Sequence, residues 1–304
     1  MKKIISLFLT VFIFASTVSC AAQRVNLPEK YPQYQYADIN GLYTRYETAG
    51  EGDTVILLHG YALSVYTWRN NLDILARNFK VYAFDWRGMG FSEKPKKVTY
   101  TVNDLVNQLI DFMDHFGIQK ATLVGSSLGG AIAAYTAVLY PERVNKLVLI
   151  DPAIFYLKPP SPLLKFASTP VVSSMVRPFL GKWTVKAVLE DLYSKNSVDL
   201  NRVSREYAKA LKTPNGKKPL IKFLRSIDYD EVAAIASEMP RVNKPTLIIW
   251  GELDDWGSVD DAKTLNKAIT GSVLNVYPSV GHLPQEEAPE LVNRQIVNFI
   301  KEDF

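Results

Sequence analysis

The feature that most constrains this chain is the turn Gly125-Ser126-Ser127-Leu128-Gly129, which separates an apolar run from an alanine-rich segment. Residues 121–124 are typical of a buried parallel strand, and residues 128–139 contain no helix breaker after Gly130. A serine at the tip of a strand-to-helix turn adopts a strained backbone that requires minimal side chains two residues before and after it. Gly125 and Gly129 meet this requirement. We therefore expect Ser127 to project from the end of a sheet, beside the unpaired N–H groups of a helix N-terminus.

Strand and helix patterns alternate on both sides of this turn. The closing helix is expected at 291–300, an amphipathic helix at 68–75, and a helix with apolar spacing at 102–116, capped by Thr101 or Asn103. Residues 43–46 predict an edge strand. Buried strands are predicted by the apolar runs at 54–58, 81–84, 144–150, 246–250 and 273–277. Runs this apolar indicate an α/β fold whose sheet is mostly parallel and doubly wound, with helices on both faces.

Residues 152–244 interrupt the alternation. They contain nine prolines and several amphipathic segments, including 183–193 and 203–211, and we interpret them as an inserted helical subdomain. A chain of 304 residues with 47% hydrophobic side chains suffices for a large core with such an insertion. The core would then consist of residues 21–151 and 245–304.

A serine hydroxyl is a weak nucleophile, so Ser127 needs a base, and the base needs an orienting acid. Of the three histidines, His282 follows the last predicted strand. Loops after parallel strands emerge at one sheet edge, which places His282 near Ser127 and makes it the predicted base. His59 ends a strand and is expected to shape its loop, whereas His115 is expected on the surface.

The acid should also follow a strand. Asp254 and Asp255 both follow the run at 246–250, and Asp151, after the preceding strand, is the next candidate. The alternative for the pair is a solvated acidic loop.

In chain order, five motifs resemble those of the α/β-hydrolase superfamily. They are His59-Gly60, an Asp-x-Arg-Gly-x-Gly-x-Ser loop at 85–92, the serine turn at 125–129, Gly-x-x-Asp at 251–254 and Gly281-His282. The order Ser, Asp, His is also that of the superfamily. The resemblance selects Asp254 over Asp255 as the acid. It also implies an oxyanion hole made of the backbone N–H groups of Tyr61 and Leu128.

The resemblance implies a serine hydrolase that cleaves a small-molecule carboxylic ester through an acyl-enzyme, without cofactor or metal. Haloalkane dehalogenases and epoxide hydrolases of this superfamily carry aspartate where Ser127 stands. Carbon–carbon bond hydrolases and cofactor-free haloperoxidases share the triad and remain alternatives, as does a non-catalytic ligand-binding protein. Carbon–carbon hydrolases usually show Ser-Met-Gly-Gly where this chain has Ser127-Leu128-Gly129-Gly130, which favours an ester.

The inserted segment corresponds to the cap of the superfamily, which covers the site and selects substrates. Its apolar side chains favour an apolar acyl or alcohol portion, although many of them must simply pack the cap. These residues are Phe155, Tyr156, Leu163, Leu164, Phe166, Phe179, Leu180 and Trp183.

The N-terminus is typical of a secretory signal peptide in residues 1–20. Lys2 and Lys3 precede an apolar run at 4–15, which is too short for a confident membrane span. Cys20, the single cysteine, follows Thr17-Val18-Ser19, which resembles the lipobox of bacterial lipoproteins and implies lipidation of Cys20, export and membrane anchoring. Ordinary cleavage near residues 21–22 and retention as an uncleaved anchor are the alternatives.

Charge is unevenly distributed. The net charge of +4 is too small to suggest nucleic acid, but residues 152–244 contain sixteen lysines and arginines against eight aspartates and glutamates. A basic cap predicts contact with anionic lipid, with a solvated basic face as the alternative. The most crowded basic residues are Lys209, Lys212, Lys217, Lys218, Lys222 and Arg225.

Overall fold

The computed structural model describes residues 24–95, 99–155, 169, 175, 177–219, 222–223 and 229–302. The signal peptide with Cys20 lies outside these residues, as do Arg225 and four of the apolar cap residues, Tyr156, Leu163, Leu164 and Phe166.

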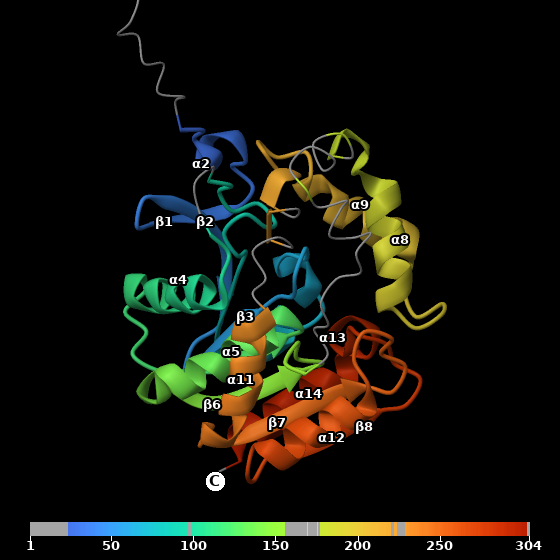
Figure 1. Cartoon of the computed structure of the whole chain (residues 1–304). Coiled ribbons are helices and arrows are strands. Elements are labelled where there is room, and N and C mark those ends of the chain that lie inside the picture. The colour runs from blue at the N-terminus through green and yellow to red at the C-terminus, as the bar shows by residue number, and fades with distance from the viewer. Residues whose placement is uncertain are drawn as a thin grey trace, which may run out of the picture.

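Within the described residues, eight strands form one sheet in the order β1-β2-β4-β3-β5-β6-β7-β8 (Figure 1). The strands are β1 (Gln35–Ile39), β2 (Leu42–Ala49), β3 (Thr54–Leu58), β4 (Lys80–Phe84), β5 (Ala121–Ser126), β6 (Val144–Ile150), β7 (Thr246–Gly251) and β8 (Val273–Tyr277). Strands β3 to β8 run parallel, and β1 and β2 join by antiparallel pairing. The predicted mostly parallel α/β sheet is confirmed.

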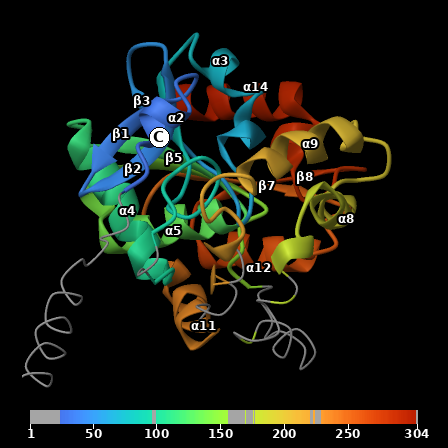
Figure 2. The same cartoon turned by 90° about the horizontal axis from the view of Figure 1, so that it is seen from above.

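Helices cover both faces of the sheet (Figure 2). Successive strand residues point to opposite faces, so Ile56 packs in one core and Leu57 in the other. The first core includes α4 (Val102–His115), α5 (Leu128–Leu139) and α12 (Val259–Ala268). The second includes the 3₁₀ helix η1 (Val65–Trp68), α3 (Leu72–Leu75) and α14 (Pro289–Lys301). Thr101 caps α4 and forms a capping box with Asp104.

Two sequence predictions about the first strands and helices were wrong. The expected edge strand at 43–46 belongs to β2, which pairs with both β1 and β4, so β1 is the edge. The expected helix at 68–75 is divided into η1 and α3. Residues 69–71 separate the two helices. Asn71, which precedes α3, is buried, and its side chain donates to Asn293 of α14 at 2.9 Å.

Four of the helices described between β6 and β7 form two groups. One group comprises α8 (Lys182–Leu192) and α9 (Leu200–Ala210), which lie side by side (Figure 1). Their buried side chains form a small core with Leu63 and Leu283. The other comprises α11 (Tyr229–Glu238) and the 3₁₀ helix η4 (Met239–Arg241), whose Ile235 and Met239 join the first sheet core. The short helices α2 (Leu27–Lys30), η2 (Pro141–Arg143), η3 (Arg177–Phe179) and α13 (Pro284–Glu287) complete the described elements.

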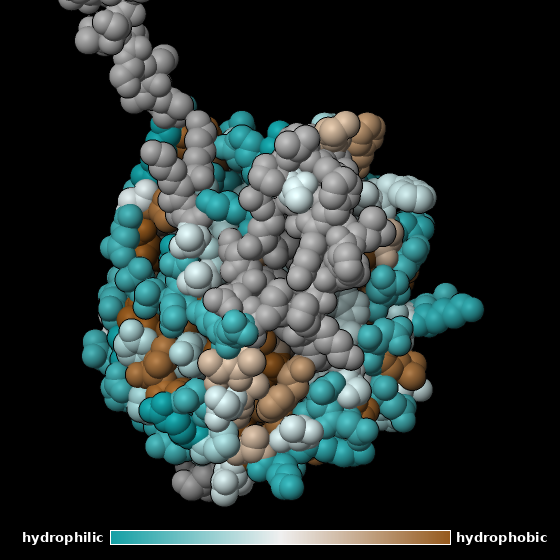
Figure 3. All heavy atoms as spheres, viewed as in Figure 1, coloured by the Kyte–Doolittle hydropathy of each residue, from teal (hydrophilic) through white to brown (hydrophobic). Residues whose placement is uncertain are grey.

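Hydrophilic side chains predominate among the coloured atoms of the face seen in Figure 3, with apolar side chains in smaller groups between them. Among the residues that the structure describes, no helix combines the length and the apolar character needed to cross a membrane.

Candidate active site

Ser127 stands between β5 and α5 in a strained conformation, with φ +53° and ψ −119°. A non-glycine residue in such a region costs about 1–3 kcal/mol, so its surroundings must enforce it. The backbone packs closely around this turn because the residues on either side are glycines. A Cβ on Gly125 would lie 2.3 Å from the carbonyl oxygen of Gly129, and a Cβ on Gly129 would lie 2.1 Å from the carbonyl oxygen of Leu58. The Ser127 N–H also donates to Ile150 O at 2.9 Å.

The two adjacent serines of the turn have different surroundings. Ser126 is fully buried at the end of β5, where its Oγ accepts a hydrogen bond from Gln285 Nε2 at 3.0 Å. Ser127 instead lines a cavity. The predicted serine is therefore the one that a substrate can reach.

The structure brings His282 and Asp254 together. His282 Nδ1 lies 2.8 Å from Asp254 Oδ2, and both side chains are buried. The other oxygen of Asp254 accepts the N–H of Trp256 at 2.8 Å, and the Trp256 ring stacks on the imidazole with centroids 5.8 Å apart. Asp255 is exposed, so burial and geometry both favour Asp254 as the orienting acid.

Close packing fixes the two loops that carry this pair. A Cβ on Gly251 would lie 1.9 Å from Gly281 O, so the loops after β7 and β8 touch only because residue 251 is glycine. The N–H of His282 donates to Leu192 O at 2.8 Å, at the end of α8. The histidine loop is therefore held from the core on one side and from α8 on the other.

The expected oxyanion-hole residues lie next to the serine. A Cβ on Gly60 would lie 3.1 Å from Ser127 Cβ, which places the backbone before Tyr61 against the serine. Leu128 is the first residue of α5, where helical N–H groups have no partner within the helix. The donor roles of Tyr61 and Leu128 stay predictions.

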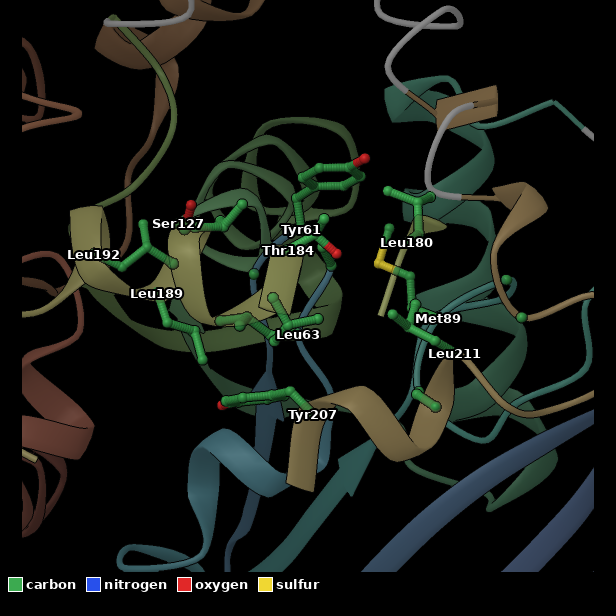
Figure 4. A pocket seen from close by; sticks show the side chains of 18 of the residues that line it. Tyr61, Leu63, Met89, Ser127, Leu180, Thr184, Leu189, Leu192, Tyr207 and Leu211 are labelled. Atoms are coloured by element: carbon green, nitrogen blue, oxygen red, sulfur yellow. The ribbon is translucent and has the colours of Figure 1, made fainter. Parts of the chain in front are cut away.

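Ser127 and His282 line a single cavity of about 390 Å³. Its other walls are largely apolar and come from both the core and the α8–α9 pair (Figure 4). In Figure 4, Leu189 and Leu192 lie on the side of Ser127, whereas Met89 and Leu211 lie on the far side. The space beside the serine therefore suits an apolar group.

The other two histidines take no part in the cavity. Burial lowers the pKa of His59, which stays neutral: its Nε2 accepts the N–H of Trp86 at 3.1 Å, and its Nδ1 lies 2.7 Å from Gly60 O. These bonds confirm the prediction that His59 shapes its loop. His115 is exposed at the end of α4, as predicted.

Sequence reasoning missed Lys94, which lines the cavity although it is buried. Its Nζ donates to Gly90 O at 2.8 Å and to Ser92 O at 2.7 Å. Burial lowers its pKa to about 7, although the nearby charge of Asp85 acts in the opposite direction. A lysine in the polar segment Glu93-Lys94-Pro95 carries no sequence signal of burial.

One group of side chains in the described part of the chain has the spacing of a metal site. Donor atoms of Asp151, Asp254 and His282 lie within 4.8 Å of one another. His282 Nδ1 already lies at hydrogen-bond distance, 2.8 Å, from Asp254 Oδ2. The arrangement therefore suits a carboxylate–imidazole pair better than a metal centre.

Comparison with known proteins identifies the family. A model of the alpha/beta hydrolase fold matches residues 53–289, which include the serine turn, Asp254 and His282. The chain belongs to the α/β-hydrolase family. The resemblance noted from five sequence motifs is thereby confirmed.

The names of the relatives of this α/β-hydrolase do not agree on one substrate. It is 30% identical over 265 residues to an uncharacterized hydrolase, YugF, of Bacillus subtilis, covering 86% of this chain and 95% of that one. It is also 30% identical over 277 residues to the 2-hydroxy-6-oxo-6-(2'-aminophenyl)hexa-2,4-dienoic acid hydrolase of Metapseudomonas resinovorans, with 88% and 90% coverage. Among solved structures, a meta-cleavage product hydrolase of Pseudomonas fluorescens matches with a TM-score of 0.74 and 25% identity, over 88% of this chain and 97% of that one.

Proposed function

We propose that this α/β-hydrolase cleaves carboxylic esters through an acyl-enzyme on Ser127. The observation that carries the proposal is the buried His282–Asp254 pair, 2.8 Å apart, whose imidazole lines the same apolar cavity as the strained serine. A nucleophile, a base and an acid in this relation are the parts that acyl transfer needs.

In the proposed mechanism, Ser127 Oγ attacks the carbonyl carbon while His282 accepts its proton. Asp254, bonded to Nδ1, holds the imidazole in the tautomer whose Nε2 is the base and stabilises the imidazolium. The N–H groups of Tyr61 and Leu128 receive the negative charge on the carbonyl oxygen. One such donor contributes about 3 kcal/mol to transition-state stabilisation. His282 returns the proton to the leaving alcohol, and a water molecule then releases the acid.

The cavity supports a substrate with an apolar acyl or alcohol portion. Leucines of α8 stand beside Ser127, and a second apolar wall at Met89 and Leu211 closes the far side (Figure 4). A cavity of about 390 Å³ lies at the small end of the range for drug-sized ligands, which favours short or medium acyl chains over long ones.

Carbon–carbon bond hydrolysis is the second candidate. It is favoured by the relative from Metapseudomonas resinovorans, which is named a hydrolase of a 2-hydroxy-6-oxo-hexadienoic acid and is 30% identical to this chain over 277 aligned residues. The substitution of leucine for the usual methionine at Leu128 favours the ester instead.

A panel of p-nitrophenyl esters of rising acyl length tests the proposal, with a 2-hydroxy-6-oxo-dienoic acid measured in parallel. We expect ester turnover to peak at short or medium acyl length and to disappear in Ser127→Ala. Turnover of the dienoic acid with none of the esters would replace the proposal with its alternative. Ester turnover that persists in Ser127→Ala would reject the nucleophile.

We also propose that the protein is exported and anchored by a lipid on Cys20. Support comes from the sequence alone, namely the charged and apolar leader followed by Thr17-Val18-Ser19-Cys20. Replacement of Cys20 by serine, followed by metabolic labelling with a fatty acid, tests it. Labelling in the parent and none in Cys20→Ser is expected, whereas an unlabelled parent would indicate ordinary signal cleavage.

A further inference from the structure

Asp151 is a buried carboxyl group for which the proposed mechanism has no use. It follows β6 directly, is completely buried and has a φ of +41°, in the left-handed region. Its N–H donates to Ile249 O at 3.0 Å, and its Oδ1 accepts the N–H of Gly251 at 3.0 Å. These bonds fix Asp151 between the ends of β6 and β7, next to the loop that carries Asp254.

Several titratable groups meet at this point. One carboxyl oxygen each of Asp151 and Asp254 and one ring nitrogen of His282 lie within 4.8 Å of one another. The charge of Glu287 of α13 also acts on Asp151. Two carboxyl groups so close in a buried site do not both ionise at neutral pH, because water solvates neither and each repels the other.

The surroundings place the shared proton on Asp151. Asp254 accepts hydrogen bonds from the N–H of Trp256 and from His282, and both favour its charged form. Burial first, and then the charge of Asp254, raise the pKa of Asp151 well above its ordinary value. One oxygen of Asp151 and one of Asp254 lie within 4.8 Å of each other, so a protonated Asp151 has an O–H group to direct at the neighbouring carboxylate.

We propose that Asp151 is a positioning residue whose protonated carboxyl group donates a hydrogen bond to the Asp254 carboxylate and keeps it aligned with His282. The inference rests on the proposed triad. It has a second consequence: a neutral side chain at position 254 removes the charge of Asp254, which opposes ionisation of Asp151 more strongly than that of Glu287 does, and so lowers the pKa of Asp151. Asp151 then becomes a carboxylate within reach of the imidazole and replaces part of the lost stabilisation.

A double-mutant cycle of Asp151→Asn and Asp254→Asn tests this inference, with kcat/KM for the best p-nitrophenyl ester measured from pH 6 to 9. Asparagine at 151 keeps an N–H donor for Asp254 and an oxygen for the N–H of Gly251. Alone, it should therefore cost no more than about threefold in kcat/KM. Asp254→Asn alone should stay at least about tenfold more active than the double variant. Its activity should also rise with pH as Asp151 ionises, and the double variant should lack this rise.

Three results would overturn the inference. One is an equal loss from Asp151→Asn in both backgrounds, which a purely structural role would give. Another is the same pH profile for Asp254→Asn and the double variant. The third is a folded but inactive Asp151→Asn, which would make Asp151 the triad acid itself. Circular dichroism checks folding, and Asp255→Asn, an exposed neighbour, is the control expected within about twofold.

The same double-mutant cycle can be measured by covalent labelling if the protein turns over no ester. The rate at which a fluorophosphonate labels Ser127 depends on the triad and requires no ester substrate. A coupled labelling cycle without ester turnover would keep the role of Asp151 and reject the proposed function. Ester turnover with no coupling between the substitutions at positions 151 and 254 would keep the proposed function and reject the role of Asp151.

Discussion

At the scale of single residues, the site depends on places where a side chain larger than hydrogen cannot fit. One such place is Gly129, where a Cβ would lie 2.1 Å from the carbonyl oxygen of Leu58. That neighbour is the backbone of a central strand, which cannot move aside as a flexible side chain can. The strained position of Ser127 thus depends on a contact between α5 and β3.

Gly129→Ala should therefore displace the start of α5 and disturb Ser127. We expect a loss of about 2 kcal/mol or more in the free energy of unfolding and a larger loss in ester turnover. Urea unfolding and kcat/KM check both. Gly181→Ala is the matched control because nothing lies within 4 Å of its added methyl group; this substitution should change stability by less than about 1 kcal/mol. An active, stable Gly129→Ala would contradict the steric account.

Lys94 predicts a pH dependence of stability. Its pKa is about 7 when folded, below its ordinary value of 10.5, so between these values the unfolded chain binds a proton that the folded chain does not. Stability from this group therefore rises as pH increases from 7 to 10.5.

Lys94→Met removes this titration. Relative to that variant, the parent should gain on the order of 3 kcal/mol of unfolding free energy between pH 7 and pH 10, measured by urea unfolding. The exposed Lys212→Met should follow the parent at both pH values. Parallel stability curves for the parent and Lys94→Met would contradict the burial of an uncharged lysine.

The sequence was sufficient to predict that Ser127 and His282 lie at the same edge of the sheet, because a short glycine motif and the end of a strand fix where each side chain emerges. It was insufficient to choose between Asp254 and Asp255 without a family resemblance, since adjacent residues of one loop have the same pattern. Burial distinguishes them, and burial depends on packing between distant segments. The burial of Lys94 and the contact of Asp151 with Asp254 depend on such packing too.

At the scale of elements, one carboxylate joins the α8–α9 pair to the core. Glu286 of α13 is buried and accepts hydrogen bonds from Thr67 Oγ1 at 2.7 Å, from Tyr193 OH at 2.7 Å and from Tyr207 OH at 2.6 Å, and it also pairs with Arg69. Burial, and after it the charge of Glu286, raise the pKa of both tyrosines, which keep their protons as donors.

Glu286→Ala should leave Arg69 and the two tyrosine hydroxyls without their acceptor. We expect a loss of about 3 kcal/mol in unfolding free energy and a raised KM, because Tyr207 lines the cavity and α8 holds the histidine loop. The exposed Glu290→Ala is the control, expected within about 0.5 kcal/mol. If KM stayed unchanged although stability fell, the contacts of Glu286 with the α8–α9 pair would have no effect on substrate binding.

The parallel strands were predictable because strands covered on both faces are continuous apolar runs. The antiparallel β1 was not, since only Ala37 and Ile39 are buried in it. The contacts of Glu286 were also beyond prediction, because its partners come from η1, the end of α8, and α9.

At the scale of the whole molecule, the exposed apolar side chains are informative. Phe179 is 80% exposed and Trp183 is 84% exposed, and Phe179 follows Pro178, whose carbonyl oxygen accepts a hydrogen bond from Lys217 at 2.9 Å. Aromatic and basic side chains together are typical of surfaces that contact lipid headgroups. They support the predicted contact of the cap with anionic lipid.

The form lacking residues 1–20 should bind liposomes that contain anionic lipid in low salt and release them in high salt, as measured by co-sedimentation. Lys217→Glu with Lys218→Glu should weaken this binding by about thirtyfold or more, because each basic residue near the surface contributes about 1 kcal/mol. Neutral liposomes are the control. Binding that ignores lipid charge, or that survives both substitutions, would leave the basic residues as a solvated face.

The central claim is that Ser127 forms an acyl-enzyme with an ester, and intact-protein mass spectrometry of a rapidly quenched reaction tests it most directly. With a p-nitrophenyl ester, we expect a mass increase of one acyl group that maps to the peptide containing Ser127. The same increase should be absent in Ser127→Ala and should accumulate more slowly in His282→Ala. An acyl group on another residue, or ester turnover with no acylated protein in the quenched reaction, would contradict the claim.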